Sequence, residues 1–472
     1  MKTLIQNGTV VTHEWSKPFD VLIDGEIIAD IGEKLSTEGV DRVVDATERL
    51  VMPGGIDVHT HLALPMFDTI SSDDHYTGHK AAAFGGTTTV MDFIPHEDHD
   101  LMPNIERWHA KAEGLAAVDY SFHMNITQFD QDVLNQLPRL LEEGIPSAKM
   151  FTAYNHRMRL TDGEIFQVMR QCSRLGILPM LHAENGDVIE VLVDEAIASG
   201  HVDPVWHART RPSWGAVEAV LRGIALAAQA GAPLYVVHMN TAGGADQLRY
   251  AKEKGLRVFG ETCPPYLFFT EEDYLKPDGA KWICSPPMRS KEDQVGLWKS
   301  LEDGIMDTVG TDHCPFFFNG AEPIEYEGKM IAIPGKELGK DDFRKIPNGL
   351  PGVGDRMPVI WTTAVNTGRI TQERFVSLMS TNPAKLFGMY PQKGTIATGS
   401  DADIVVWDPE KEVKYGVNVA QHRTDYNLFE GWQLKGMPTT VFSRGDLLVE
   451  NGIWYGKAGR GKFLHRKPFS IE

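Results

Sequence analysis

The chain has 472 residues, 42% of them hydrophobic and 24% charged, so it can bury a large core and has the composition of an ordinary globular enzyme. Its 65 acidic residues outnumber 46 basic ones and give a formal charge of −19, which argues against nucleic acid or an anionic membrane as the main partner. The four cysteines show no CxxC spacing, and the sequence shows neither a signal peptide nor an apolar run long enough to span a bilayer. We therefore expect a soluble, cytoplasmic protein with reduced thiols.

Both ends of the chain are rich in short apolar runs separated by tight turns. An Asn-Gly pair, which is typical of hairpin turns, occurs at positions 7–8 and again at 451–452. Two β-rich ends around a different middle indicate that both termini contribute to one domain. We predict a small β-sandwich domain built from residues 1–52 and 392–472.

The middle of the chain, residues 53–391, alternates short β-branched runs with helical stretches. Such alternation is typical of βα units around a parallel sheet. Eight strands are predicted, the number that closes a (β/α)8 barrel, and they span residues 56–62, 87–94, 119–126, 148–153, 177–183, 234–240, 257–262 and 306–312. We predict an α/β fold in which this segment forms a TIM-barrel catalytic domain.

Side chains that can bind metal fall at the ends of four predicted strands. His59 and His61 end the first strand, His182 the fifth, His238 the sixth and Asp312 the eighth. Residues two apart on a strand point to the same face, so both imidazoles of the first pair can converge. A lone histidine in an apolar strand is more often a satisfied core residue than a ligand. In barrel enzymes the active site lies at the C-terminal ends of the strands. Five metal-competent side chains at these ends therefore indicate a metal centre.

Lys149 lies on the fourth predicted strand among apolar neighbours. A cationic lysine cannot bind a metal ion, and its burial without a partner would be costly. One interpretation is a long side chain that reaches a carboxylate. The other is that Lys149 reacts with carbon dioxide and bridges two metal ions as a carbamate. The residues alone leave both interpretations open.

Two neighbouring features offer ligand types but are not assigned to the site. The run His-Glu-Asp-His-Asp at residues 96–100 follows the second strand, and we interpret it as a solvated loop. His313 is adjacent to Asp312, and alternation along an extended chain predicts that its ring points the opposite way.

Eight short motifs occur in order over nearly the whole chain. They are PGGIDVHTH (53–61), AAAFGGTTT (81–89), HAEN (182–185), ETCPPY (261–266), CSPPMR (284–289), GTDHCP (310–315), PNGLPGV (347–353) and NPAKLF (382–387). Together they make the chain resemble the dihydropyrimidinase and hydantoinase family of cyclic amidohydrolases. The resemblance is specific because it rests on an ordered series of motifs.

The resemblance implies a centre of two divalent metal ions inside a TIM barrel. Its ligands would be His59, His61, Lys149, His182, His238 and Asp312, with N6-carboxylysine at Lys149 as the bridging ligand. Zinc suits such a nitrogen- and oxygen-ligated hydrolytic site, with manganese or cobalt as alternatives. The family's substrate-binding and catalytic tyrosine falls on Tyr154, and its backbone contacts to the ring amide fall on Ser285 and Asn348. Family members are commonly homotetramers.

The activity implied is hydrolytic ring opening of a small cyclic amide to an N-carbamoyl amino acid. The substrate would be a hydantoin, a 5-monosubstituted hydantoin or a 5,6-dihydropyrimidine. A hydroxide bound by both metal ions would attack the ring carbonyl, and Asp312 would pass its proton to the departing ring nitrogen. Tyr154 and one metal ion would stabilise the oxyanion.

Other functions fit parts of the same pattern. Another cyclic amidohydrolase, of the allantoinase or dihydroorotase type, is the nearest alternative. No arginine follows closely after His61, which counts against a carboxylated ring. A non-catalytic barrel scaffold is a third hypothesis from a different class, and the complete set of ligand residue types counts against it.

Three segments depart from the common family pattern, and these departures leave the preferred ring substrate open. Met239 and Asn240 follow His238 where many relatives have a serine, and the segment 155–158 after Tyr154 is more polar than an apolar gate. An apparent insertion over residues 320–339 lengthens the loop after the eighth strand. Whether it covers the active site or elaborates the surface stays open.

Overall fold

The computed structural model describes residues 1–66, 68–326 and 328–470, and an eight-stranded parallel barrel lies at their centre. The barrel strands are β8 (Gly55–Thr60), β11 (Thr87–Ile94), β12 (Asp119–Asn125), β13 (Ser147–Phe151), β14 (Leu178–His182), β15 (Leu234–Val236), β16 (Val258–Thr262) and β17 (Thr308–Val309). Each strand pairs with the next, and a parallel bridge from Thr60 to His313 joins the two ends of the sheet. The predicted TIM barrel is confirmed.

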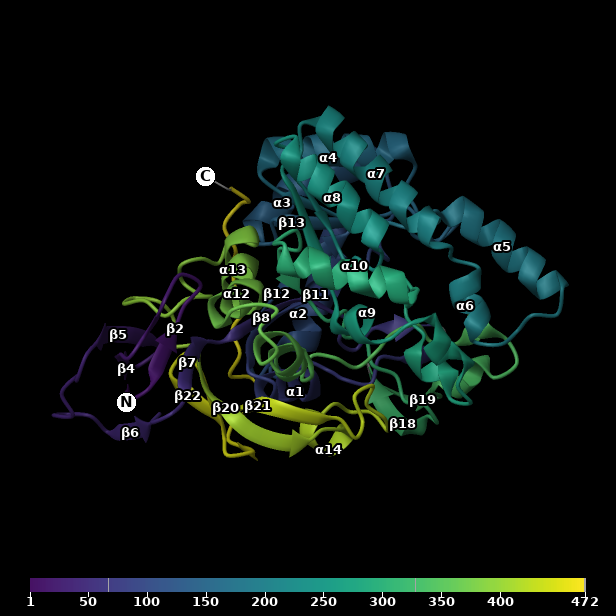
Figure 1. Cartoon of the computed structure of the whole chain (residues 1–472). Coiled ribbons are helices and arrows are strands. Elements are labelled where there is room, and N and C mark those ends of the chain that lie inside the picture. Colours follow the sequence, from purple (N-terminus) through teal and green to yellow (C-terminus); the bar gives the residue numbers. More distant parts are fainter. Residues whose placement is uncertain (67, 327, 471–472) are drawn as a thin grey trace.

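Helices cover the outside of the barrel (Figure 1). They are α1 (Thr77–Phe84), α2 (Leu101–Ala112), α3 (Gln131–Glu142), α4 (Asp162–Leu175), α5 (Gly186–Ala198), α6 (Val205–Arg209), α7 (Ser213–Ala230), α8 (Ala242–Glu253), α9 (Pro264–Phe268), α10 (Lys291–Glu302), α11 (Arg356–Ile360), α12 (Gln372–Val376), α13 (Asn382–Leu386) and α14 (Val417–Ala420). Local signals set their ends. For example, α4 begins at a capping box between Thr161 and Glu164 and ends at Gly176, whose φ of +75° favours glycine. No helix of the described residues is long and apolar enough to cross a membrane.

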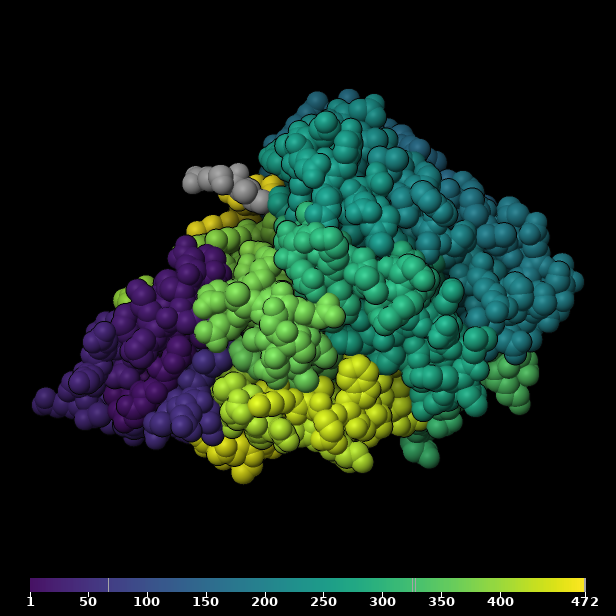
Figure 2. Space-filling view, in the orientation of Figure 1, coloured from purple at the N-terminus to yellow at the C-terminus, as the bar shows by residue number. Residues whose placement is uncertain are grey.

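Strands from both chain ends form two further sheets beside the barrel. One has the order β5 (Ile27–Gly32), β4 (Asp20–Asp24), β1 (Lys2–Gln6), β6 (Arg42–Asp45). The other has the order β23 (Ile453–Trp454), β22 (Asp446–Glu450), β21 (Gln433–Ser443), β20 (Ile404–Lys414), β7 (Leu50–Pro53), β2 (Thr9–Val11), β3 (Ser16–Lys17). Because β20 pairs with β7, the N-terminal and C-terminal segments lie side by side, as the purple and yellow surfaces of Figure 2 show. The predicted small β-domain is confirmed.

Two barrel strands end earlier than the sequence predicts. β15 stops at Val236 and β17 at Val309, whereas the predicted strands ran to residues 240 and 312. His238 and Asp312 therefore lie on the loops just beyond their strands, with φ of +38° and +53°. This left-handed region is unfavourable for side chains with a Cβ and interrupts strand pairing. The correction leaves both residues at the C-terminal end of the barrel.

The segment after the eighth strand forms a hairpin of β18 (Ala321–Tyr326) and β19 (Lys329–Ile333). It lies beside the small hairpin of β9 (Pro65–Met66) and β10 (Thr69–Ile70), because the Thr69 hydroxyl donates to the Pro334 carbonyl at 2.7 Å. The predicted insertion therefore has its own regular structure and is anchored to a neighbouring loop.

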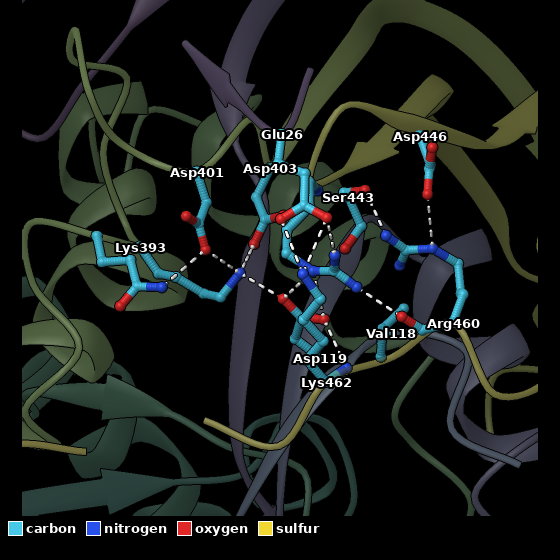
Figure 3. Close-up of polar contacts among 12 residues, drawn as sticks. Glu26, Val118, Asp119, Lys393, Asp401, Asp403, Ser443, Asp446, Arg460 and Lys462 are labelled. Carbon is cyan, nitrogen blue, oxygen red and sulfur yellow. Dashed lines mark hydrogen bonds and ion pairs between the residues drawn. The ribbon is translucent and has the colours of Figure 1, made fainter. Parts of the chain in front are cut away.

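The opposite, N-terminal end of the barrel carries a buried ion-pair network (Figure 3). The Lys393 ammonium lies 2.8 Å from Asp119 at the start of β12 and 2.7 Å from Asp403 beside β20. The Arg444 guanidinium donates to both oxygens of Asp119 at 2.9 Å. The backbone of Lys462 also donates to Asp119, so one buried carboxylate ties together the barrel, the β-domain and the C-terminal segment.

We expect Lys393→Met to lower the free energy of unfolding by about 3–5 kcal/mol, because it leaves buried carboxylates without their cation. Urea unfolding followed by circular dichroism measures the change. The matched control is Lys2→Met, which removes a pair to Asp24 with side-chain exposures of 47% and 49% and should cost no more than about 1 kcal/mol. Equal effects of the two substitutions would contradict the assignment of Lys393 as the central cation of this network.

Candidate functional site

A first group of metal-competent atoms lies where β8 meets the loop after β17. The Nε2 atoms of His59 and His61 are each 3.1 Å from Oδ1 of Asp312. The three residues can place their ligand atoms within 4.8 Å of one another. Burial lowers the pKa of His61 to about 4, so its imidazole is neutral and has a lone pair to offer. Burial would raise the pKa of Asp312, but the facing imidazoles outweigh it and hold that pKa well below its usual range.

A second pair of imidazoles lies beside the first group. Nδ1 of His182 at the end of β14 is 3.0 Å from Nε2 of His238. Burial and the neighbouring His182 ring hold the pKa of His238 well below its ordinary value. Both rings are buried, and a hydrogen bond between their facing nitrogen atoms keeps them together.

Lys149 on β13 lies next to both groups. Its Nζ is 3.1 Å from Nε2 of His59 and 4.2 Å from the centre of the Phe93 ring. Within the described part of the chain, no ion pair joins this amine to a carboxylate, although Asp312 and Glu261 are close enough to oppose the effect of burial on its pKa. Burial lowers the pKa of Lys149 to about 8, so the neutral amine is far more populated near neutral pH than in an exposed lysine. A neutral amine is the form that reacts with carbon dioxide.

Buried glutamates hold the far sides of two imidazoles, a role that the sequence analysis missed. Oε1 of Glu261 is 2.7 Å from Nδ1 of His59 and accepts from the backbone N–H of His238 at 2.9 Å. Oε2 of Glu184 is 2.9 Å from Nε2 of His182. Such carboxylate partners orient a ligating ring and fix which nitrogen keeps its lone pair. Two sequence features could have indicated these roles. Glu261 is an acidic residue within a buried strand, and Glu184 follows the candidate ligand His182 by two residues.

Asp57, two residues before His59, has a structural role. Its carboxylate accepts from the Thr311 hydroxyl at 2.6 Å and from the backbone N–H groups of Thr311 and His59 at 3.2 Å. These bonds join β8 to the loop that carries Asp312. Asp57 therefore sets the spacing between the two parts of the first group without pointing into it.

The three predicted substrate contacts also come together. Tyr154 follows β13 with a φ of +66° and lines a cavity with Glu184 and Arg211. Its hydroxyl shares a hydrogen bond with the Ser285 side chain, and Asn348 donates to Ser285 Oγ at 3.2 Å. Burial raises the pKa of Tyr154, so the phenol keeps its proton and can act as a donor. A non-glycine residue in left-handed backbone is strained, and such strain is frequent at functional sites.

The acidic and histidine-rich loop at residues 96–100 is held by other partners. The Arg107 guanidinium pairs with Glu97 and with Asp98, and His99 lies 2.6 Å from Asp130. These side chains are largely exposed, which agrees with the interpretation of a solvated loop.

His313 points away from Asp312, as the alternation of the chain predicted. Its Nε2 is 3.1 Å from Asp73, and its Nδ1 accepts from the backbone N–H groups of Gly352 and Val353. Both ring nitrogens are therefore occupied by bonds that stabilise the loops around the barrel.

Comparisons with known proteins agree with this geometry. The chain matches the amidohydrolase family over residues 50–448. It is 43% identical to a D-hydantoinase of Geobacillus stearothermophilus, over 99% of this chain and 97% of that protein. It is 40% identical to a D-phenylhydantoinase of Escherichia coli (strain K12 / DH10B), over 99% of each. Among solved structures, a dihydropyrimidinase from Brevibacillus agri NCHU1002 has a TM-score of 0.95 at 45% identity and covers 100% of both chains.

We expect Glu261→Gln to weaken divalent-metal affinity about 10- to 100-fold, because the amide holds the His59 ring less firmly and carries no charge. Competition with a chromophoric chelator measures the affinity, and elemental analysis gives the metal content. Glu97→Gln, on the solvated loop, is the matched control and should leave both unchanged. Unaltered affinity in Glu261→Gln would contradict the role assigned to this carboxylate.

Proposed function

Because the chain belongs to the amidohydrolase family and covers nearly the whole length of its hydantoinase relatives, we propose that it hydrolyses a cyclic amide. The ring would be a hydantoin, a 5-monosubstituted hydantoin or a 5,6-dihydropyrimidine, and the product an N-carbamoyl amino acid. The observation that carries the proposal is the convergence of His59, His61 and Asp312 beside Lys149 at the C-terminal end of the barrel.

The residues fit a pair of divalent ions, for which zinc is our proposal. His59, His61 and Asp312 would hold one ion, and His182 with His238 the other. Lys149, as a carbamate, would supply an anionic oxygen to each, and the burial that lowers its pKa to about 8 supports that modification because it makes the neutral amine more available. When bound, the ions would acidify water and polarise the ring carbonyl.

The protein's own side chains would orient the ring and move the proton. The Asp312 carboxylate, whose low pKa keeps it ionised at neutral pH, would accept the proton of the attacking water and return it to the departing ring nitrogen. The protonated phenol of Tyr154 would donate to the oxyanion that develops on the carbonyl oxygen. The backbones of Ser285 and Asn348 would hold the ring amide.

We also propose that the protein is a homotetramer and that it is located in the cytoplasm.

The activity test uses hydantoin, dihydrouracil and phenylhydantoin, with ring opening followed as loss of ultraviolet absorbance. We expect the metal-loaded protein to open at least one of them and Lys149→Ala to lose nearly all activity, because no bridging anion is left. Acetate or propionate should restore part of it, since a short carboxylate can occupy the place of the carbamate.

Lys299→Ala, at a side chain that is 68% exposed, is the control and should keep full activity. Full activity of Lys149→Ala without added acid would contradict the bridging role. Failure of the wild-type protein to open any of the three rings would contradict the proposed substrate class.

A further inference from the structure

A third buried lysine, Lys336, lies outside both the candidate metal centre and the ion-pair network of Lys393. It begins the short turn Lys336–Gly339 after β19, and its side chain is only 1% exposed. Its Nζ donates to the backbone carbonyls of Ile283 at 2.9 Å and Pro347 at 3.0 Å. Within the described residues no carboxylate lies within ion-pair distance of this amine, so it is not a member of a salt bridge.

The two carbonyls belong to the segments that carry the proposed ring contacts. Ile283 is two residues before Ser285, and Pro347 directly precedes Asn348. The segments also touch each other directly, because Gly349 N–H donates to Ile283 O at 3.1 Å and Asn348 donates to Ser285 Oγ at 3.2 Å. The Lys336 amine therefore joins the two segments at residues that precede the proposed ring contacts in the sequence.

The chemistry of the amine suits two carbonyls. Burial lowers the pKa of Lys336 to about 7, so the neutral amine is well populated at neutral pH. A neutral amine has two N–H donors, which match the two carbonyl acceptors, and it needs no counter-ion. An apolar side chain of the same length would fill this space but would leave Pro347 O without this donor.

The turn that carries Lys336 is itself fixed. The backbone N–H of Lys336 donates to the Phe317 carbonyl at 2.9 Å. Two residues earlier, the Pro334 carbonyl accepts from the Thr69 hydroxyl at 2.7 Å. The amine is thus delivered from the loop after the eighth strand by a segment anchored on two sides. Such anchoring lets Lys336 define a distance between its two acceptors.

We propose that Lys336 is a positioning residue that fixes the spacing of the Ser285 and Asn348 backbones and thereby sets the affinity for the ring amide. This inference rests on the proposed function, since it assigns the residue to substrate binding in that reaction. The metal centre and Asp312 do not contact Lys336, so the substitution should change KM and leave kcat nearly unchanged.

The test compares Lys336→Met with the wild-type holoenzyme on a ring that the wild type opens. We expect KM to rise about tenfold with kcat within about twofold, because the lost interaction is made equally in the ground and transition states. Metal content by elemental analysis should be unchanged. Lys336→Gln, which can still donate to one carbonyl, should give an intermediate KM and serves as a second variant if Lys336→Met does not fold.

Two controls separate positioning from general damage. Lys340→Met makes the same substitution at an exposed residue of the same loop and should behave as wild type. A ring methylated at the nitrogen between its two carbonyls cannot donate from that nitrogen. We expect wild type and Lys336→Met to bind this analogue, measured as an inhibitor, with nearly equal Ki values.

An unchanged KM in Lys336→Met and Lys336→Gln would overturn the inference. So would a loss confined to kcat or accompanied by a loss of metal. If the wild-type protein opens none of the rings, the proposed function itself fails, which is a result distinct from a wild-type protein that works with a dispensable Lys336.

Discussion

The carboxylate of Glu261 lies 2.7 Å from Nδ1 of His59, and the rest of the candidate centre depends on that hydrogen bond. It turns the other ring nitrogen toward Asp312, 3.1 Å away, so a buried imidazole lies between the buried carboxylate of Glu261 and the partly exposed carboxylate of Asp312. Burial and the Lys149 amine would lower the pKa of His59, but the two carboxylates outweigh them and raise it. The negative field that favours a proton there also favours a divalent cation, whose charge is larger. The same Glu261 oxygen accepts from the backbone of His238 and so links both groups of imidazoles.

The N-terminal end of the barrel contributes mainly to stability, and the C-terminal end carries the candidate functional site. At the N-terminal end, Asp119 and Lys393 are buried and fully paired, and they join the barrel to the strands of both chain ends. At the C-terminal end, Tyr154, His238 and Asp312 have left-handed backbone, and basic nitrogens face one another at hydrogen-bond distances. Such an arrangement is unfavourable by itself and is held by the surrounding structure. This division is typical of barrel enzymes, whose loops at one end can change while the other end keeps the fold.

The sequence predicted the eight strands and the metal-competent residues because both depend on local patterns. Apolar periodicity locates the strands, and the spacing of His59 and His61 places two rings on one face. The resemblance to cyclic amidohydrolases then placed these residues and Lys149 in one predicted set of metal ligands. The ends of β15 and β17 were predicted wrongly because left-handed φ at His238 and Asp312 follows from tertiary contacts that no local pattern records. The roles of Glu261 and Lys336 were missed for the same reason. Glu261 is 202 residues from His59 in the sequence, and Lys336 is 53 residues from Ile283. Only the folded chain brings these partners together.

Isotope labelling directly tests our proposal that Lys149 is a carbamate shared by two metal ions. The protein is reconstituted with the divalent metal in ¹³C-labelled bicarbonate, and the carbamate carbon is observed by ¹³C nuclear magnetic resonance alongside elemental analysis. We expect a carbamate signal that is lost in Lys149→Ala, together with roughly two metal ions per chain. A protein that opens the ring and binds its metal but shows no carbamate carbon would contradict it.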